Sequence, residues 1–203
     1  MPELIERILV HLGISIAGVS MATLAGVTLG IALTWNKKLA PSVMGFIELL
    51  QTIPSLAMLS ILFVILKKLG NTTAVIAIFF YSLLPIVRNT YAGILSVEPS
   101  LIEAGRGMGM SPLQILFKVQ IPNAIPVIVS GMRISLITAY GIVTIAVLVG
   151  GGGLGKYVYR GTQMQNMAML LTGAIPICLM AFFTDILLNK AEKRLTKHNK
   201  TKE

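Results

Sequence analysis

The sequence predicts an all-α membrane protein with about five transmembrane helices and one cytoplasmic helix between the third and the fourth. Of its 203 residues, 55% are hydrophobic and only 12% are charged, whereas about a quarter of the residues of a globular protein are charged. Five apolar stretches approach or exceed the roughly 20 residues that a helix needs to cross a hydrocarbon core of about 30 Å. None of them alternates with a period of two, so helices are the expected spans.

The five predicted spans cover approximately residues 8–35, 43–66, 72–88, 125–149 and 168–188. The first one follows the acidic residues Glu3 and Glu6 and is longer than the apolar core of a cleaved signal peptide. We therefore expect it to be retained as a membrane segment. The predicted organisation is an external N-terminus at 1–7, a transmembrane domain at 8–189, and a basic cytoplasmic tail at 190–203 that frays.

The connection between the third and fourth spans, from about residue 89 to residue 122, is the longest of the chain. Connections of this length are usually either functional or disordered. This one carries apolar side chains such as Leu101 and Phe117, which a disordered linker would lack. We expect an ordered helix here, with Ser100 and Glu103 at the Ser-x-x-Glu spacing of a capping box.

The positive charges predict how the chain is oriented in the cell (inner, cytoplasmic) membrane, because cytoplasmic loops carry an excess of Lys and Arg. With a cytoplasmic C-terminus, the cytoplasmic side holds most of the 17 basic residues, namely Lys37, Lys38, Arg88, Arg106, Lys118, Arg133 and those of the tail. This orientation also places the long third connection in the cytoplasm. Since the basic residues form short separate clusters and not one basic face, nucleic acid is not an expected partner.

No residue pattern points to catalysis or to metal binding. Because Cys178 is the only cysteine, an internal disulfide and a multi-cysteine zinc site are excluded. Cys178 lies in an apolar run. Residues 150–156 imitate a phosphate-binding loop, but Tyr157 stands where the Mg²⁺-binding Ser or Thr belongs and no strand precedes the loop. We expect no cofactor bound by this chain and interpret the glycines as a sharp turn.

One motif in the third connection carries a family resemblance. Glu103, Ala104 and Gly105 are followed after three residues by Gly109 and, nine residues later, by Val-Gln-Ile-Pro at 119–122. The spacing closely resembles the signature of ABC-importer permeases, which reads E-A-A, three residues, G, nine residues, I-x-L-P, with Gly105 in place of the second alanine. Stretches at 51–57, 84–91 and 150–155 resemble the osmoprotectant branch, which imports glycine betaine, choline, carnitine and related quaternary amines.

The resemblance implies a transport subunit that catalyses no reaction itself. It places a coupling helix within 98–111, as part of a coupling region at 98–122, and docks that helix in a groove of a separate ATP-binding subunit that uses ATP and Mg²⁺. Glu103 is then near the contact and Gly109 allows the sharp turn after it; the full set of implied coupling residues is Glu103, Ala104, Gly105, Gly109 and Pro122. Further implied partners are a second permease subunit, identical or related, an extracytoplasmic substrate-binding protein and the lipid bilayer.

The second span contains the candidate translocation path. Pro54 frees a backbone carbonyl, which transporters tolerate where the carbonyl lines a cavity or packs against protein. Gln51 and Thr52 lie one turn before it, and Glu48 is an acid near or within an apolar stretch, which makes it a functional candidate. The alternatives are a kink that serves packing only and, for Glu48, an ion pair near the membrane surface.

Three other functions remain open at this stage. Permeases of related importers, for amino acids such as methionine, share parts of the signature. A secondary transporter or channel would work without an ATPase. A membrane enzyme would need a polar constellation that the sequence does not contain.

Overall fold

The structure, a computed structural model, describes residues 2–200, with side chains through residue 196. All regular elements of the described residues are helical, which confirms the predicted all-α class. Besides a π-helical turn η1 and a 3-10 turn η2, they comprise nine α-helices. In chain order the elements are α1 Pro2–Trp35, α2 Ala40–Thr52, α3 Ser55–Leu66, α4 Asn71–Leu95, α5 Pro99–Gly107, α6 Pro112–Ile115, η1 Leu116–Gln120, α7 Ile121–Ile145, η2 Ala146–Val149, α8 Gly155–Gln163 and α9 Met167–Lys200.

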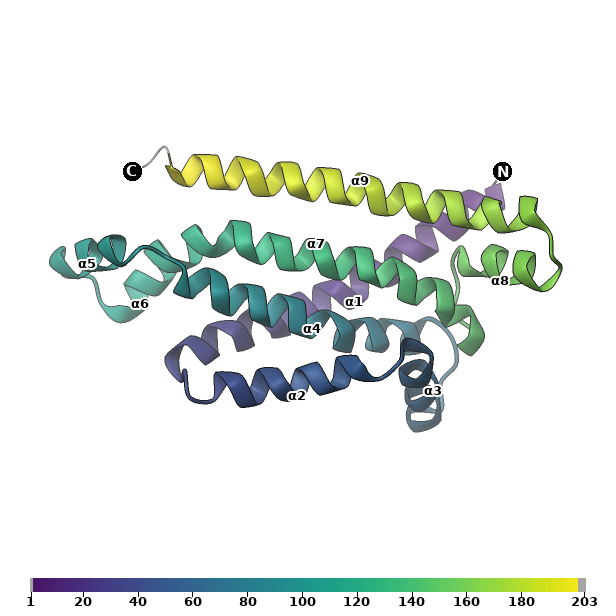
Figure 1. The fold of residues 1–203 in the computed structure, drawn as a ribbon, viewed down its shortest axis with the longest axis horizontal. Helices are drawn as coiled ribbons and strands as arrows, with labels where there is room; N and C mark the ends of the chain where they lie inside the picture. The colour runs from purple at the N-terminus through teal and green to yellow at the C-terminus, as the bar shows by residue number, and fades with distance from the viewer. Residues whose placement is uncertain (1, 201–203) are drawn as a thin grey trace.

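Four long helices, α1, α4, α7 and α9, run along the length of the molecule (Figure 1). The helices α5 and α6 lie at one end and α8 lies at the other, and we call these the α5 end and the α8 end. Within the described residues, four helical segments are long and apolar enough to cross a membrane, and the bent pair α2 and α3 brings the number to five. The predicted number of about five spans agrees with this arrangement.

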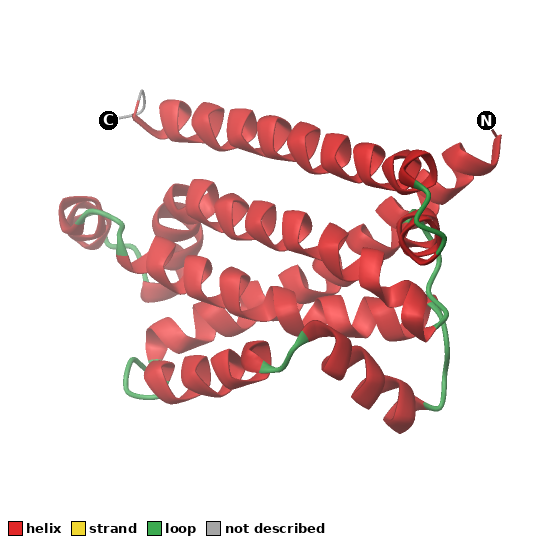
Figure 2. Cartoon of the chain, turned by 45° about the vertical axis from the view of Figure 1, so that its right-hand side comes forward, coloured by secondary structure: helices red, strands yellow, loops and turns green. Residues whose placement is uncertain are grey.

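The second predicted span, 43–66, differs from the prediction because it is not one straight helix. The helices α2 and α3 are bent by 95° at the break between Thr52 and Ser55, and Figure 2 shows α3 leaving the line of α2. Pro54 lies in the break and has no N–H to continue the hydrogen bonds of α2. The 13 residues of α2 rise only about 20 Å, so α2 alone is too short to cross, and the pair passes as a span only when both helices are counted together.

Small residues allow α1 to lie very close to α4. A side-chain carbon added at Gly18 would be 2.6 Å from Ile78 Cγ2, and one added at Gly30 would be 2.7 Å from Thr90 Cβ. These residues and Gly26 recur at helical spacing along α1, so they form one contact stripe. The close contact is therefore internal and places α4 at the centre of the bundle.

At the α8 end, a buried histidine joins α1 to the glycine-rich loop. The backbone N–H of Leu154 donates to His11 Nδ1 at 3.3 Å, so the opposite ring nitrogen, Nε2, carries the proton that it donates to the Tyr140 carbonyl at 3.1 Å. Gly150 and Gly153 in the same loop have φ of 79° and 89°, as the predicted sharp turn requires. The loop thus connects α1, α7 and α8.

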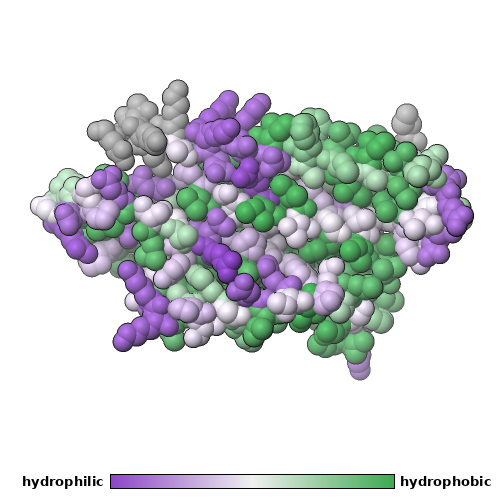
Figure 3. All heavy atoms as spheres, in the orientation of Figure 1, coloured by the Kyte–Doolittle hydropathy of each residue, from purple (hydrophilic) through white to green (hydrophobic). Residues whose placement is uncertain are grey.

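The last helix, α9, lies mostly on the outside of the bundle. Arg133 of α7 pairs with Asp185 at 3.3 Å and with Glu192 at 3.5 Å. Figure 3 shows a hydrophobic surface over the α8-end half of α9 and hydrophilic residues toward its other end. The helix continues through Lys200, so residues 190–200 of the predicted basic tail belong to α9.

Candidate functional site

The break in the second span is held to α4 by two hydrogen bonds. In a regular helix the Tyr81 carbonyl would accept from the N–H of residue 85, but Pro85 has none. The side-chain amide of Gln51 donates to this carbonyl instead, and the Tyr81 hydroxyl donates to the carbonyl of Ile53. The proline in α4 therefore creates the acceptor that holds the break in α2 and α3 in place.

A groove lies beside this link. It consists of two hollows of about 430 and 350 Å³, and the residues shared by both are Gln51, Tyr81 and Thr138. The first hollow extends along the break, and the second extends along α4 toward Arg88. We call the two hollows together the groove. Its polar lining consists of the Tyr81 phenol, side-chain amides and hydroxyl groups, and, in the second hollow, the Arg88 guanidinium; the rest of the wall is apolar.

The structure brings three of the four predicted path residues to the groove. Gln51, Thr52 and Pro54 line the first hollow. Glu48 does not line either hollow; its carboxylate lies 3.4 Å from the guanidinium of Arg88. Both side chains are more than half exposed, at 56% and 54%, so the pair lies on the surface of the bundle and not in its core.

Several groove residues were not among the four predicted path residues. Thr138 of α7 has no sequence signal, because it becomes part of the groove only when α7 packs against α4. Tyr81 does have one: it stands four residues before Pro85, so its carbonyl had to lose its helical donor. Arg88 could also have been proposed as the partner of Glu48, since an acid near an apolar segment needs a cation.

The predicted coupling helix is present as α5, but its start differs from the prediction. Glu98 occupies the N-cap position and Pro99 the first turn, where the missing N–H of proline is harmless. Ser100 therefore lies inside the helix, and its hydroxyl donates to Glu98 Oε1 at 2.6 Å. The predicted capping box of Ser100 and Glu103 is wrong; the box forms at the next helix, between Ser111 and Gln114.

Helix α5 ends in a common C-terminal capping motif. Gly109 has φ of 77°, its N–H donates to the Arg106 carbonyl, and the N–H of Met110 donates to the Gly105 carbonyl. This pair of bonds is the Schellman motif, which requires a left-handed residue after the helix. The structure thus has the sharp turn that was expected at Gly109.

The two faces of α5 differ. Glu103 and Ala104 are exposed, whereas Gly105 is buried and faces Ile115. Pro122 lies in the first turn of α7, directly after the π-helical turn η1. The outer face of α5 is therefore available for a partner, and its inner face packs on the chain itself.

The described residues contain no cluster of three or more His, Cys, Asp or Glu side chains that could hold a metal ion. The most deeply buried titratable side chain away from the groove, His11, is occupied on both nitrogens. Its bonds are structural, between α1, α7 and the loop before α8.

Residues 22–197 match a protein family, described as the binding-protein-dependent transport system inner membrane component. Two curated relatives come from Bacillus subtilis. The choline transport system permease protein OpuBB is 41% identical, with 96% of this chain and 89% of the relative aligned. The glycine betaine/carnitine/choline transport system permease protein OpuCB is 42% identical over the same shares. The carnitine transport permease protein OpuCB of Listeria monocytogenes is also 42% identical, over 92% of this chain and 85% of that one.

Solved structures show the same fold. A chain of the MetNI methionine ABC transporter in an inward-facing conformation superposes with a TM-score of 0.85 at 24% identity, over 97% of both chains. A chain of an amino acid ABC transporter crystallised with histidines gives a TM-score of 0.72 at 20% identity, over 97% of this chain and 94% of that one.

Proposed function

We infer the function of this chain from the family to which it belongs, the binding-protein-dependent transport system inner membrane components. It is a multi-pass membrane protein, and its curated relatives are transport permeases. We propose that it is the permease subunit of an ATP-driven importer for a small osmoprotectant such as glycine betaine, choline or carnitine. The observation that carries this proposal is the 41–42% identity, along more than nine tenths of the chain, to permeases named for those solutes.

The groove supports a translocation role. It is open on one side, so a single subunit does not enclose a solute. We propose that a second permease subunit, identical or related, covers it and that the path runs between the two. The expected path residues are Gln51, Thr52 and Pro54 at the break, with Glu48 and Arg88 beside them.

The chemistry of the first hollow suits a quaternary amine, because this hollow contains Tyr81 whereas the Arg88 guanidinium lines only the second hollow. Such a cation has no hydrogen-bond donor, and it is attracted to the face of an aromatic ring. Tyr81 supplies a ring whose hydroxyl is already occupied by the Ile53 carbonyl. One ring gives weak binding, which a transport path needs because the solute must also leave.

The outer face of α5 supports the coupling role. We propose that Glu103 and Ala104 contact a cytoplasmic ATP-binding subunit, that Gly105 and Gly109 shape the helix and its end, and that Pro122 marks the start of α7 behind it. ATP and Mg²⁺ belong to that partner, and this chain hydrolyses nothing. The α5 end and the C-terminus are then cytoplasmic, and a substrate-binding protein delivers the solute at the α8 end.

Uptake of labelled solute tests the proposal. Cells that lack osmolyte uptake would express the chain with its partner subunits, either with an active ATP-binding subunit or with one inactivated in its ATP site. We expect uptake of glycine betaine, choline or carnitine only with the active partner. Methionine uptake in its place would assign a different solute, and uptake that persists with the inactive partner would contradict an ATP-driven importer.

A further inference from the structure

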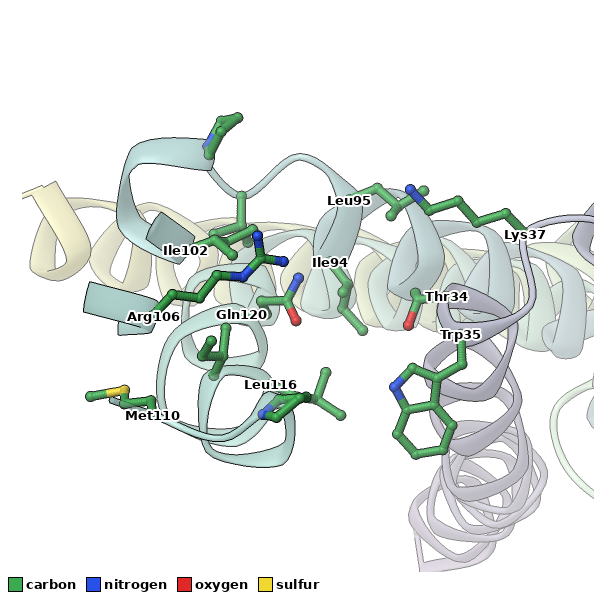
Figure 4. Close-up of a pocket in the computed structure, with 14 residues that line it drawn as sticks. Thr34, Trp35, Lys37, Ile94, Leu95, Ile102, Arg106, Met110, Leu116 and Gln120 are labelled. Atoms are coloured by element: carbon green, nitrogen blue, oxygen red, sulfur yellow. The ribbon is translucent and has the colours of Figure 1, made fainter. Parts of the chain in front are cut away.

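The α5 end contains a cavity that the transport function does not use. Its volume is about 650 Å³, within the size range of small-molecule sites. It is open to one side, and its lining residues come from the end of α1, the end of α4 and the segment from α5 to η1, as Figure 4 shows. It is separate from the groove, since the two share no lining residue.

The charged residues that line this cavity are all basic. Lys37 and Arg106 line it, and no Asp or Glu side chain does. Among the ion pairs of the described residues, none involves Lys37 or Arg106. Glu98 and Glu103 are close in sequence to Arg106, but neither lines the cavity. Two basic side chains that line one cavity without an acid attract an anion.

The rest of the lining supplies polar groups and an apolar wall. Gln120 and Thr34 carry an amide and a hydroxyl group, and Figure 4 shows Arg106 extending toward Gln120. Trp35 lies opposite, at the end of α1. Tryptophan at the end of an apolar span is typical of the membrane surface, where lipid headgroups lie.

We propose that this cavity binds a phosphate group between Lys37 and Arg106, carried by an anionic membrane lipid. Arginine is well suited to phosphate oxygens because its planar guanidinium donates two parallel hydrogen bonds. Exposed apolar lining residues such as Leu95 and Pro112 would contact the lipid beyond its headgroup. Inorganic phosphate is the soluble source of the same chemistry, and the membrane-surface Trp35 favours the lipid.

The bound phosphate would connect two parts of the molecule. Arg106 belongs to the last turn of α5, whose main contacts are with α6 and η1. Lys37 belongs to the loop between α1 and α2. A phosphate held by both side chains therefore fastens α5 to the first two helices. This inference rests on the cavity alone and stands whether or not the proposed solute is right.

The only tryptophan of the chain lines the cavity and serves as the reporter. The purified full-length chain, in an uncharged detergent, would be titrated with short-chain phosphatidylglycerol and, separately, with phosphatidylcholine of the same chain length. We expect a saturable change in Trp35 emission with phosphatidylglycerol and a response at least about tenfold weaker with phosphatidylcholine.

The variant Lys37→Gln/Arg106→Gln should raise the half-saturating phosphatidylglycerol concentration about tenfold or more, because both charged donors are lost. The control Lys38→Gln/Lys118→Gln removes the same charge at the same end, but neither residue lines the cavity; it should stay within about twofold. If the double variant misfolds, Lys37→Gln alone, in an exposed loop, should still weaken binding several-fold. Equal effects of test and control variants would overturn the proposal.

A third titration with inorganic phosphate identifies the source. A saturable response that the test variant loses would support the phosphate site and assign it to a soluble ligand. No response to either source would overturn the proposal, and if the test variant then also fails to co-purify with the ATP-binding subunit, the two cations belong to that protein contact.

Discussion

The side-chain amide of Gln51 donates to the Tyr81 carbonyl, the acceptor that Pro85 leaves without a helical donor. The two residues are 30 positions apart, and their bond lies where the second span breaks. The hydrogen-bond donor that Pro85 removes from α4 is thus replaced by a side chain of α2. This arrangement explains how a sharp break persists inside the bundle next to the groove.

Replacing Gln51 by Leu should destabilise the protein, because the Tyr81 carbonyl then has no donor. We expect a loss of about 1–3 kcal/mol, measured as a lower temperature of unfolding in detergent by circular dichroism. The second substitution Pro85→Ala restores an N–H one turn after Tyr81 and should recover part of the loss in the Gln51→Leu background. Simply additive effects of the two substitutions would show that they do not share the carbonyl.

Reversing the charge of Glu103 should separate membrane insertion from assembly. Glu103 is exposed on α5 and makes no ion pair among the described residues. We expect Glu103→Arg to insert normally and to co-purify at least about tenfold less ATP-binding subunit, since a charge is reversed at the proposed contact. The matched control is Glu6→Arg, the same change at an exposed site of the α8 end, and normal pull-down by Glu103→Arg would remove this residue from the contact.

Two glycines of the coupling region should respond in opposite directions to alanine. A side-chain carbon at Gly105 would lie 3.4 Å from Ile115 and 3.6 Å from Met110, which is ordinary contact, so Gly105→Ala should stabilise the protein by about 0.5–1 kcal/mol. Gly109 has φ of 77°, and Gly109→Ala should cost about 1–2 kcal/mol. Unfolding temperatures of the two variants test the pair, and a stabilised Gly109→Ala would contradict the left-handed turn.

Removing the His11 ring should loosen the α8 end. His11→Leu leaves the buried N–H of Leu154 without an acceptor, and a buried unsatisfied group costs about 1–3 kcal/mol. The amide in His11→Gln retains a donor and an acceptor and should recover part of the loss. Hydrogen exchange of the 150–155 backbone measures the effect; equal protection in the wild type and His11→Leu would show that the bond does not hold the loop.

Much of the fold could be predicted from the sequence because each helix carries its own signal. The apolar length predicts a span regardless of its neighbours. The position of α5 and the turn at Gly109 also depend on local residues. The capping box was misplaced because Ser100 and Ser111 both stand three residues before a suitable partner. Pro99 starts α5 before Ser100, so Ser100 cannot cap it, whereas Ser111 directly precedes the first residue of α6.

The groove could not be predicted from the sequence, because it forms through contacts between segments that are distant in the chain. Hydropathy runs through Pro54 without interruption, since transmembrane helices tolerate proline, so the 95° bend could not be inferred from it. Thr138 and Arg88 became part of the groove through the packing of α4 with α7 and α2.

By itself, then, the sequence determined that the chain is helical and spans a membrane, and it located the short helix α5 and the turn at Gly109, because apolar length, charge and turn residues act over a few neighbouring positions. Only the tertiary structure decided where the second span breaks and which carbonyl receives the Gln51 amide. It also decided that Glu48 faces Arg88 and that Lys37 and Arg106 share one cavity. Those features arise from residues far apart in the sequence, and only the packing of the helices brings such residues together.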